Sequence, residues 1–132
     1  MKKHYLNTVL LLFTMIGFGQ SVEQLTIEIR KDSTDASVRY QRAKLLLKDH
    51  HSIGQLQMAI DDLQQYQKLT DTYTAKVYEA QLWAYTTILL KPGQTNDTEF
   101  AKAALRVIAE AKKKLPDYKP SSSDLKLFES YQ

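Results

Sequence analysis

"RYQRAKLLL" at residues 39–47 and "MAIDDLQQYQKL" at residues 58–69 are the stretches that decide the fold of this chain. Each places one alanine, Ala43 or Ala59, among larger apolar residues at the spacing of one helix face. Two helices that approach closely need small side chains where their axes cross. We therefore predict a helical hairpin in which Ala43 and Ala59 lie at the crossing.

The helical period of apolar residues extends over most of the chain beyond residue 20. It predicts helices over residues 22–30, 36–48, 55–69, 74–90 and 99–115, and a short final helix over 124–131 capped by Ser123. Proline and glycine in this part fall between these segments, where helices end. We expect an all-α fold with a single domain over residues 21–132. The segment at 74–90 is the most apolar, so it should lie centrally, with Tyr78 and Trp83 in structural positions.

Residues 1–20 have the layout of a secretory signal peptide. Lys2 and Lys3 precede an apolar run at 9–18, and Gly17 and Gly19 suit a cleavage site. The apolar run is shorter than the roughly 20 residues that a membrane-spanning helix needs. We expect export to the periplasm or outside the cell, with the membrane contacted only through the leader before cleavage. An N-terminal anchor that is never cut is the alternative.

Charge and cysteine content narrow the function classes. The chain has 18 basic and 15 acidic residues, and residues 1–20 hold two of the basic and none of the acidic ones. The remainder carries a net charge of only +1, with both signs interleaved. It lacks the broad basic field that nucleic-acid binding requires. The sequence has no cysteine, which excludes disulfides, thiolate metal sites and a cysteine nucleophile.

Two helical hairpins in series indicate an internal repeat. Small and large residues recur within them at Ala43, Leu46, Ala59, Leu63, Ala80, Trp83, Ala104, Ile108 and Ala111, and Pro116 follows the last. This pattern resembles the tetratricopeptide repeat (TPR) over residues 25–116. The paired alanines lie 16 residues apart in the first hairpin and 24 in the second, against about 12 in the usual repeat unit of about 34 residues. A generic α-helical bundle is the alternative.

The resemblance also implies a binding surface. In that family the first helix of each repeat lines a concave groove that holds a partner segment. The corresponding residues are Tyr40, Lys44 and Lys48 in the first hairpin and Gln81 and Tyr85 in the second. Aromatic and lysine side chains together suit an extended peptide or a carboxylate.

The sequence shows no constellation typical of catalysis. His50 and His51 are adjacent, lack the i, i+4 spacing of a helical metal pair and are expected at a solvated helix end. Asp61 and Asp62 diverge by about 100° on a helix, so we read them as an exposed acidic face. The serines at 121–123 lack a glycine-flanked elbow and read as a linker. We predict no catalytic residues, no metal and no cofactor.

These observations favour an exported, non-enzymatic interaction or scaffold module whose partner is a protein or peptide, with no nucleic acid. Two repeats are near the lower limit for a stable stack, so self-association is possible. The alternative is a compact helical bundle acting as an inhibitor or immunity-type protein through its convex face. A small hydrolase is a third hypothesis, and it would need a pocket with converging Asp, His or Ser side chains.

Overall fold

The computed structural model describes residues 20–132, and within them all regular secondary structure is helical. The helices are α2 (Val22–Lys31), α3 (Ala36–Asp49), α4 (Ile53–Thr70), α5 (Ala75–Leu89), α6 (Asp97–Lys114) and α7 (Ser122–Glu129). The predicted all-α fold is confirmed for this part of the chain. The predicted signal peptide lies outside the described residues, except for Gln20. None of the helices described is both long enough and apolar enough to span a membrane.

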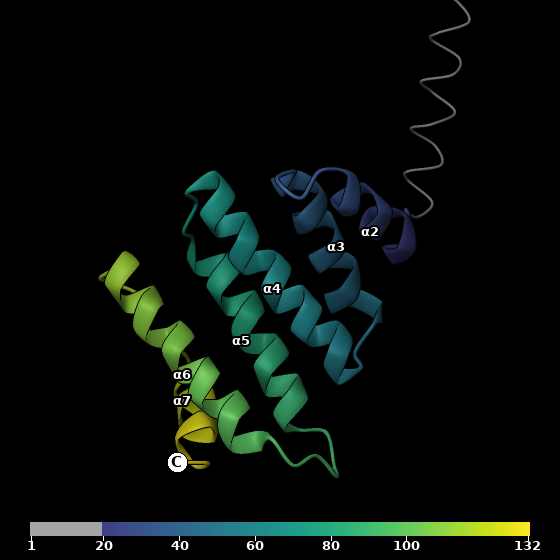
Figure 1. Ribbon diagram of the computed structural model, residues 1–132. Coiled ribbons are helices and arrows are strands. Elements are labelled where there is room, and N and C mark those ends of the chain that lie inside the picture. Colours follow the sequence, from purple (N-terminus) through teal and green to yellow (C-terminus); the bar gives the residue numbers. More distant parts are fainter. Residues whose placement is uncertain (1–19) are drawn as a thin grey trace, which may run out of the picture.

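The helices form a row in which each packs against the next in sequence (Figure 1). The row begins with α2 and α3, continues through α4 and α5, and ends with α6. The short α7 folds back and packs on both α6 and α5. Helix α5 therefore has neighbours on several sides, as the apolar segment at 74–90 predicts.

Side-chain caps mark the start of most of the helices. The hydroxyls of Ser21 and Ser52 each accept a hydrogen bond from the backbone N–H of the glutamine three residues on, and the backbone N–H of each serine donates to the side-chain oxygen of that glutamine. The cap at Ser52 starts α4 at Ile53, two residues earlier than predicted. Ser121 caps α7, so the prediction of Ser123 is wrong. Asn96 holds the N-cap position of α6 but makes no side-chain capping bond.

The first alanine pair occupies the position that the sequence predicts. Ala43 and Ala59 are both fully buried and belong to one apolar cluster between α3 and α4. The second pair does not match. Ala80 is partly exposed and packs beside that same first cluster, whereas Ala104 lies in the larger cluster of α5, α6 and α7. Ala84 is the buried alanine of α5 that shares a cluster with Ala104.

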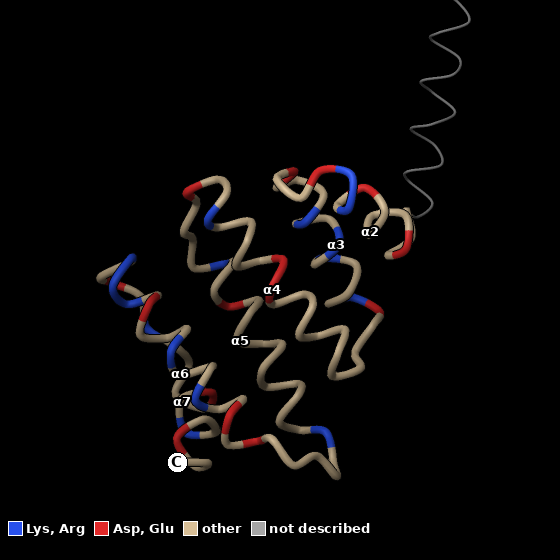
Figure 2. Tube along the Cα trace, in the orientation of Figure 1, with Lys and Arg blue, Asp and Glu red and all other residues tan. Residues whose placement is uncertain are grey.

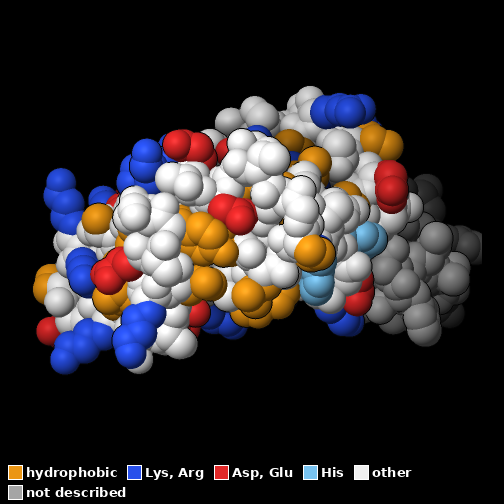
Figure 3. Space-filling view, turned by 90° about the horizontal axis from the view of Figure 1, so that it is seen from below, with side chains coloured by type: hydrophobic (Ala, Val, Ile, Leu, Met, Phe, Trp, Pro, Cys, Tyr) orange, Lys and Arg blue, Asp and Glu red, His pale blue; other side chains and the backbone are white. Residues whose placement is uncertain are grey.

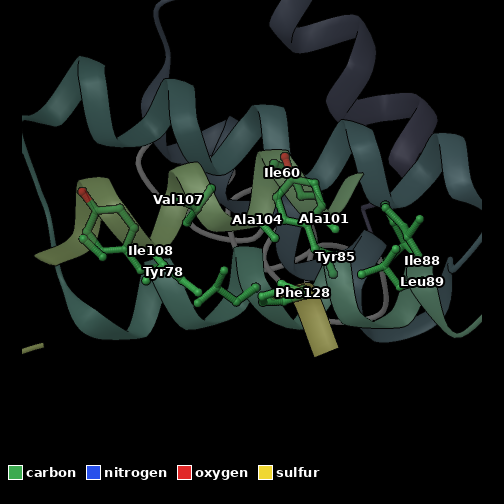
Figure 4. Close-up of a cluster of buried hydrophobic side chains, with 14 of the residues drawn as sticks. Ile60, Tyr78, Tyr85, Ile88, Leu89, Ala101, Ala104, Val107, Ile108 and Phe128 are labelled. Carbon is green, nitrogen blue, oxygen red and sulfur yellow. The ribbon is translucent and has the colours of Figure 1, made fainter. Parts of the chain in front are cut away.

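Helix α5 is buried on most of its circumference but not on all of it. Tyr78 is fully buried, which confirms its structural role. Figure 4 shows it in the cluster that joins α5 to α6 and α7. Trp83 is 46% exposed, so its expected interior position is wrong. It lies about 200° around the helix from Tyr85, which is buried, and so the two residues point to opposite faces.

Candidate functional site: a groove between α4 and α6

An open groove runs between α4 and α6, with α5 beneath it. Its larger hollow has a volume of about 320 Å³. The hollow is lined from α4 by Gln57, Ile60, Asp61 and Gln64, from α5 by Tyr85, and from α6 by Glu99, Phe100, Ala103 and Arg106. Figure 4 shows Ile60 and Tyr85 side by side, with Ala101 and Ala104 of α6 next to them. An apolar floor with a polar rim is the usual make-up of a binding pocket.

The groove continues past Gln64 toward the other end of α4. A second hollow of about 190 Å³ is lined by Gln64, Gln67, Lys68, Tyr73 and Glu110. Gln64 lines both hollows, so we treat them as one feature, the α4–α6 groove. The ammonium of Lys114 lies 4.2 Å from the Tyr73 ring centroid, a cation–π distance that fixes one end of the groove.

Amide side chains form a ladder along the floor of the groove. Gln64 donates to the side-chain oxygen of Gln81 over 3.4 Å, and Gln81 donates to the side-chain oxygen of Gln67 over 3.0 Å. Gln81 is 1% and Gln67 2% exposed. The ladder ends there, because Nε2 of Gln67 has no hydrogen-bond partner among the described residues.

Burial also affects the pKa values of two tyrosines, Tyr85 and Tyr78. Burial raises the pKa of Tyr85, and the positive charge of Arg106 partly opposes that rise. Burial also raises the pKa of Tyr78, and the negative charge of Glu110 adds to the effect. Both phenols are therefore neutral and able to donate at neutral pH. Figure 2 shows charges of both signs along α6 and few along α5, so the charged groups of the groove lie on its walls.

The structure separates the five residues predicted to form one groove. Gln81 and Tyr85 share a face of α5, but that face meets α4 and α6. Tyr40, Lys44 and Lys48 belong to α3. The Tyr40 ring lies 4.8 Å from that of Tyr66, and the ammonium of Lys44 lies 5.6 Å from the Tyr40 centroid.

Lys48 is exposed, and none of the three α3 residues lines the α4–α6 groove. Gln81 is buried in the floor rather than presented on a concave wall. The two hairpins therefore do not place their predicted residues on one surface.

The expected acidic face is wrong for one of its two carboxylates. Asp61 is exposed and lines the groove, but Asp62 is fully buried. Asp62 accepts hydrogen bonds from Nε and Nη2 of Arg42 at 2.7 and 2.8 Å, and from Nη1 of Arg39 at 3.2 Å. Arg42 also donates to Oγ1 of Thr26 at 3.0 Å. This network joins α2, α3 and α4 beneath the surface and has a structural role.

The two described histidines lie at the end of α3. His50 is the C-cap of that helix, and the His51 ring meets the ring of Trp83 edge to face at 5.3 Å. Both histidines are half-buried instead of fully solvated. Figure 3 shows them at the edge of a face on which hydrophobic side chains gather. Within residues 20–132 no group of three or more His, Asp or Glu side chains is placed to hold a metal ion.

The groove was not found from the sequence because its walls come from α4 and α6, the second helices of the two predicted hairpins. One signal was available. Gln57, Gln64 and Gln67 recur at helical spacing on α4, and three glutamines on one face of a helix supply both donors and acceptors. Such groups can pair with the N–H and C=O groups of an extended peptide.

No protein-family model matches this chain, and neither does any curated protein or solved structure. The geometry of the groove is therefore the feature that bears on function.

Proposed function

We propose that this protein is an exported, non-enzymatic binding module that holds an extended segment of another protein in the α4–α6 groove. The observation that carries the proposal is the unpartnered amide of Gln67, which is 2% exposed and lines the groove. A buried donor without an acceptor costs about 1–3 kcal/mol. A backbone carbonyl of a bound segment would supply the acceptor and remove that cost.

The larger hollow supplies an anchor site. Ile60, Tyr85 and Phe100 surround a space of about 320 Å³, which is within the range of small binding pockets. One apolar side chain of the segment would enter here. Gln57 and Gln64 flank the space and would pair with the backbone on either side of the anchor.

The walls favour a segment that is polar on both sides of its anchor. Asp61 and Arg106 carry opposite charges beside the hollow, and charged rims around an apolar centre are typical of protein interfaces. We take the stacking of the hairpins to be TPR-like, which is supported by the packing of each helix on its successor. In this proposal the groove lies on the side of the second helices, not of the first helices as the resemblance implies.

A peptide-display selection on the purified protein tests the proposal. The peptides that it enriches are then titrated against the wild type and against Ala103→Phe, which fills the larger hollow from α6. Ala103 is only partly buried, so this variant should keep the fold, and a thermal melt checks that it does. We expect enriched peptides to share one apolar residue between polar ones, and A103F to weaken their binding at least tenfold.

The matched control is the double variant Lys44→Glu/Lys48→Glu on α3, which should leave binding unchanged. If the control loses binding and A103F keeps it, the binding surface lies on α3 and the groove proposal is wrong. Equal binding by all three proteins would also contradict it.

A further inference from the structure

A separate cavity lies on the opposite side of α5, between that helix and α7. Its volume is about 260 Å³, slightly below the range typical of pockets for whole small molecules. Such a space suits a compact head group. No residue that lines it also lines the α4–α6 groove, so the two sites are independent.

Two aromatic side chains form part of the cavity wall. Trp83 comes from α5 and is 46% exposed, and Tyr118 comes from the segment before α7 and is 9% exposed. The faces of such rings carry negative electrostatic potential and attract cations within about 6 Å of the centroid. Both rings contribute to the lining, as the rings of an aromatic cage do.

Two carboxylates line the same cavity. Glu79 lies on α5, one turn before Trp83, and Asp124 lies in the first turn of α7. No lysine or arginine of residues 20–132 forms an ion pair with either of them, and none lines the cavity. Both negative charges raise the pKa of Tyr118, after the larger effect of burial, so both lie close to its ring.

A polar group beside the cavity is unpaired. Thr86 lines the cavity, and its hydroxyl is inaccessible to solvent and has no hydrogen-bond partner in the described part of the chain. The lining therefore combines two carboxylates and two aromatic rings, and it contains no lysine or arginine. A neutral apolar ligand would leave both carboxylates uncompensated.

We propose that this cavity binds an alkylammonium group, with the cation held between Trp83 and Tyr118 and neutralised by Glu79 and Asp124. The group could belong to a free small molecule, such as a quaternary ammonium compound, or to a lysine side chain of a protein. The recognition chemistry is the same for both sources, because a ring face and a carboxylate attract either cation.

Trp83 provides a direct reporter because it is the only tryptophan in the chain. The experiment titrates the purified protein with choline and follows tryptophan fluorescence. The same titration with 3,3-dimethylbutan-1-ol, the neutral analogue of the same shape, separates charge from size. We expect saturable binding of choline that is at least about tenfold tighter than binding of the neutral analogue.

Variants assign the binding to the cavity. The double variant Glu79→Gln/Asp124→Asn keeps the shape of the side chains and removes both charges, and it should weaken choline binding about tenfold or more. Asp117→Asn is the matched control because Asp117 is exposed, adjacent to Tyr118 in sequence and outside the cavity lining. It should bind choline as the wild type does. Thermal melts of both variants should match the wild type.

A third titration, with N-acetyl-lysine methylamide, distinguishes the two sources. Tighter binding of choline assigns the site to a free quaternary ammonium ligand, and tighter binding of the lysine derivative assigns it to a protein side chain. The proposal is overturned if choline causes no saturable change, if the neutral analogue binds equally well, or if the double variant binds choline like the wild type.

Discussion

Removal of the buried carboxylate of Asp62 should be among the most damaging single changes to this fold. Asp62 is fully buried and accepts hydrogen bonds at 2.7, 2.8 and 3.2 Å from two arginines. In Asp62→Ala the side chain of Arg42, 8% exposed, keeps its charge without a carboxylate partner. Breaking one side of a buried ion pair costs about 3–5 kcal/mol. At about 4 °C per kcal/mol for a domain of this size, the melting midpoint should fall by about 12–20 °C.

The assay is thermal and urea unfolding followed by far-ultraviolet circular dichroism. The neighbouring variant Asp61→Ala is the control, because Asp61 is 63% exposed and its carboxylate lies as far as 4.0 Å from the guanidinium of Arg39. It should change the unfolding free energy by less than about 0.5 kcal/mol. The apolar pair Arg42→Met/Asp62→Leu should recover most of the loss. A loss below about 1 kcal/mol in D62A, or equal losses in D62A and D61A, would show that the buried ion pair does not stabilise the fold.

The alanines and the buried tyrosines give three more predictions. Ala59→Leu should overpack the crossing of α3 and α4 and cost about 1–3 kcal/mol in urea unfolding; an unchanged midpoint would remove the close-packed hairpin. Ala84→Leu should lower the unfolding free energy by a similar amount. Ala80→Leu should change it by less than about 0.5 kcal/mol, because Ala80 is partly exposed. A larger loss for Ala80→Leu than for Ala84→Leu would place the crossing of α5 and α6 at Ala80. The raised pKa values of Tyr78 and Tyr85 mean that the folded state binds these protons more tightly than the unfolded state. This stabilisation is complete below pH 10 and is lost as the pH rises above 10. The urea midpoint should therefore fall between pH 10 and 11, and it should fall less in Tyr78→Phe. A midpoint that does not change over this pH range would contradict the prediction.

The apolar period predicted the helices well, because it involves residues that are close together in the sequence. The apolar period located every described helix, and Ser52 shows why the boundaries moved. A capping box pairs Ser52 with Gln55, and so α4 begins at Ile53 although its apolar stripe starts later. The first crossing was predictable for the same reason: Ala43 and Ala59 lie on the faces that their own helices present to each other.

Assignments that depend on which neighbouring residues a helix face meets failed. Asp61 and Asp62 look equivalent in the sequence, and only the packing of α3 on α4 places Arg42 over one of them. Gln81 and Tyr85 do share a face, but the sequence does not tell which neighbours that face meets. An apolar helix read alone gives no reason to leave Trp83 at the surface, and its exposure depends on where α7 folds back.

The most direct test of the proposed binding groove is a nuclear magnetic resonance titration of the ¹⁵N-labelled protein with a display-selected peptide, following the side-chain amide of Gln67. We expect this resonance to move on binding, because its unpartnered N–H gains an acceptor, and we expect the side-chain amide resonance of Gln64 to move with it. The backbone amides of Lys44 and Lys48 should stay in place. A Gln67 resonance that does not move while the α3 amides shift would contradict the central claim.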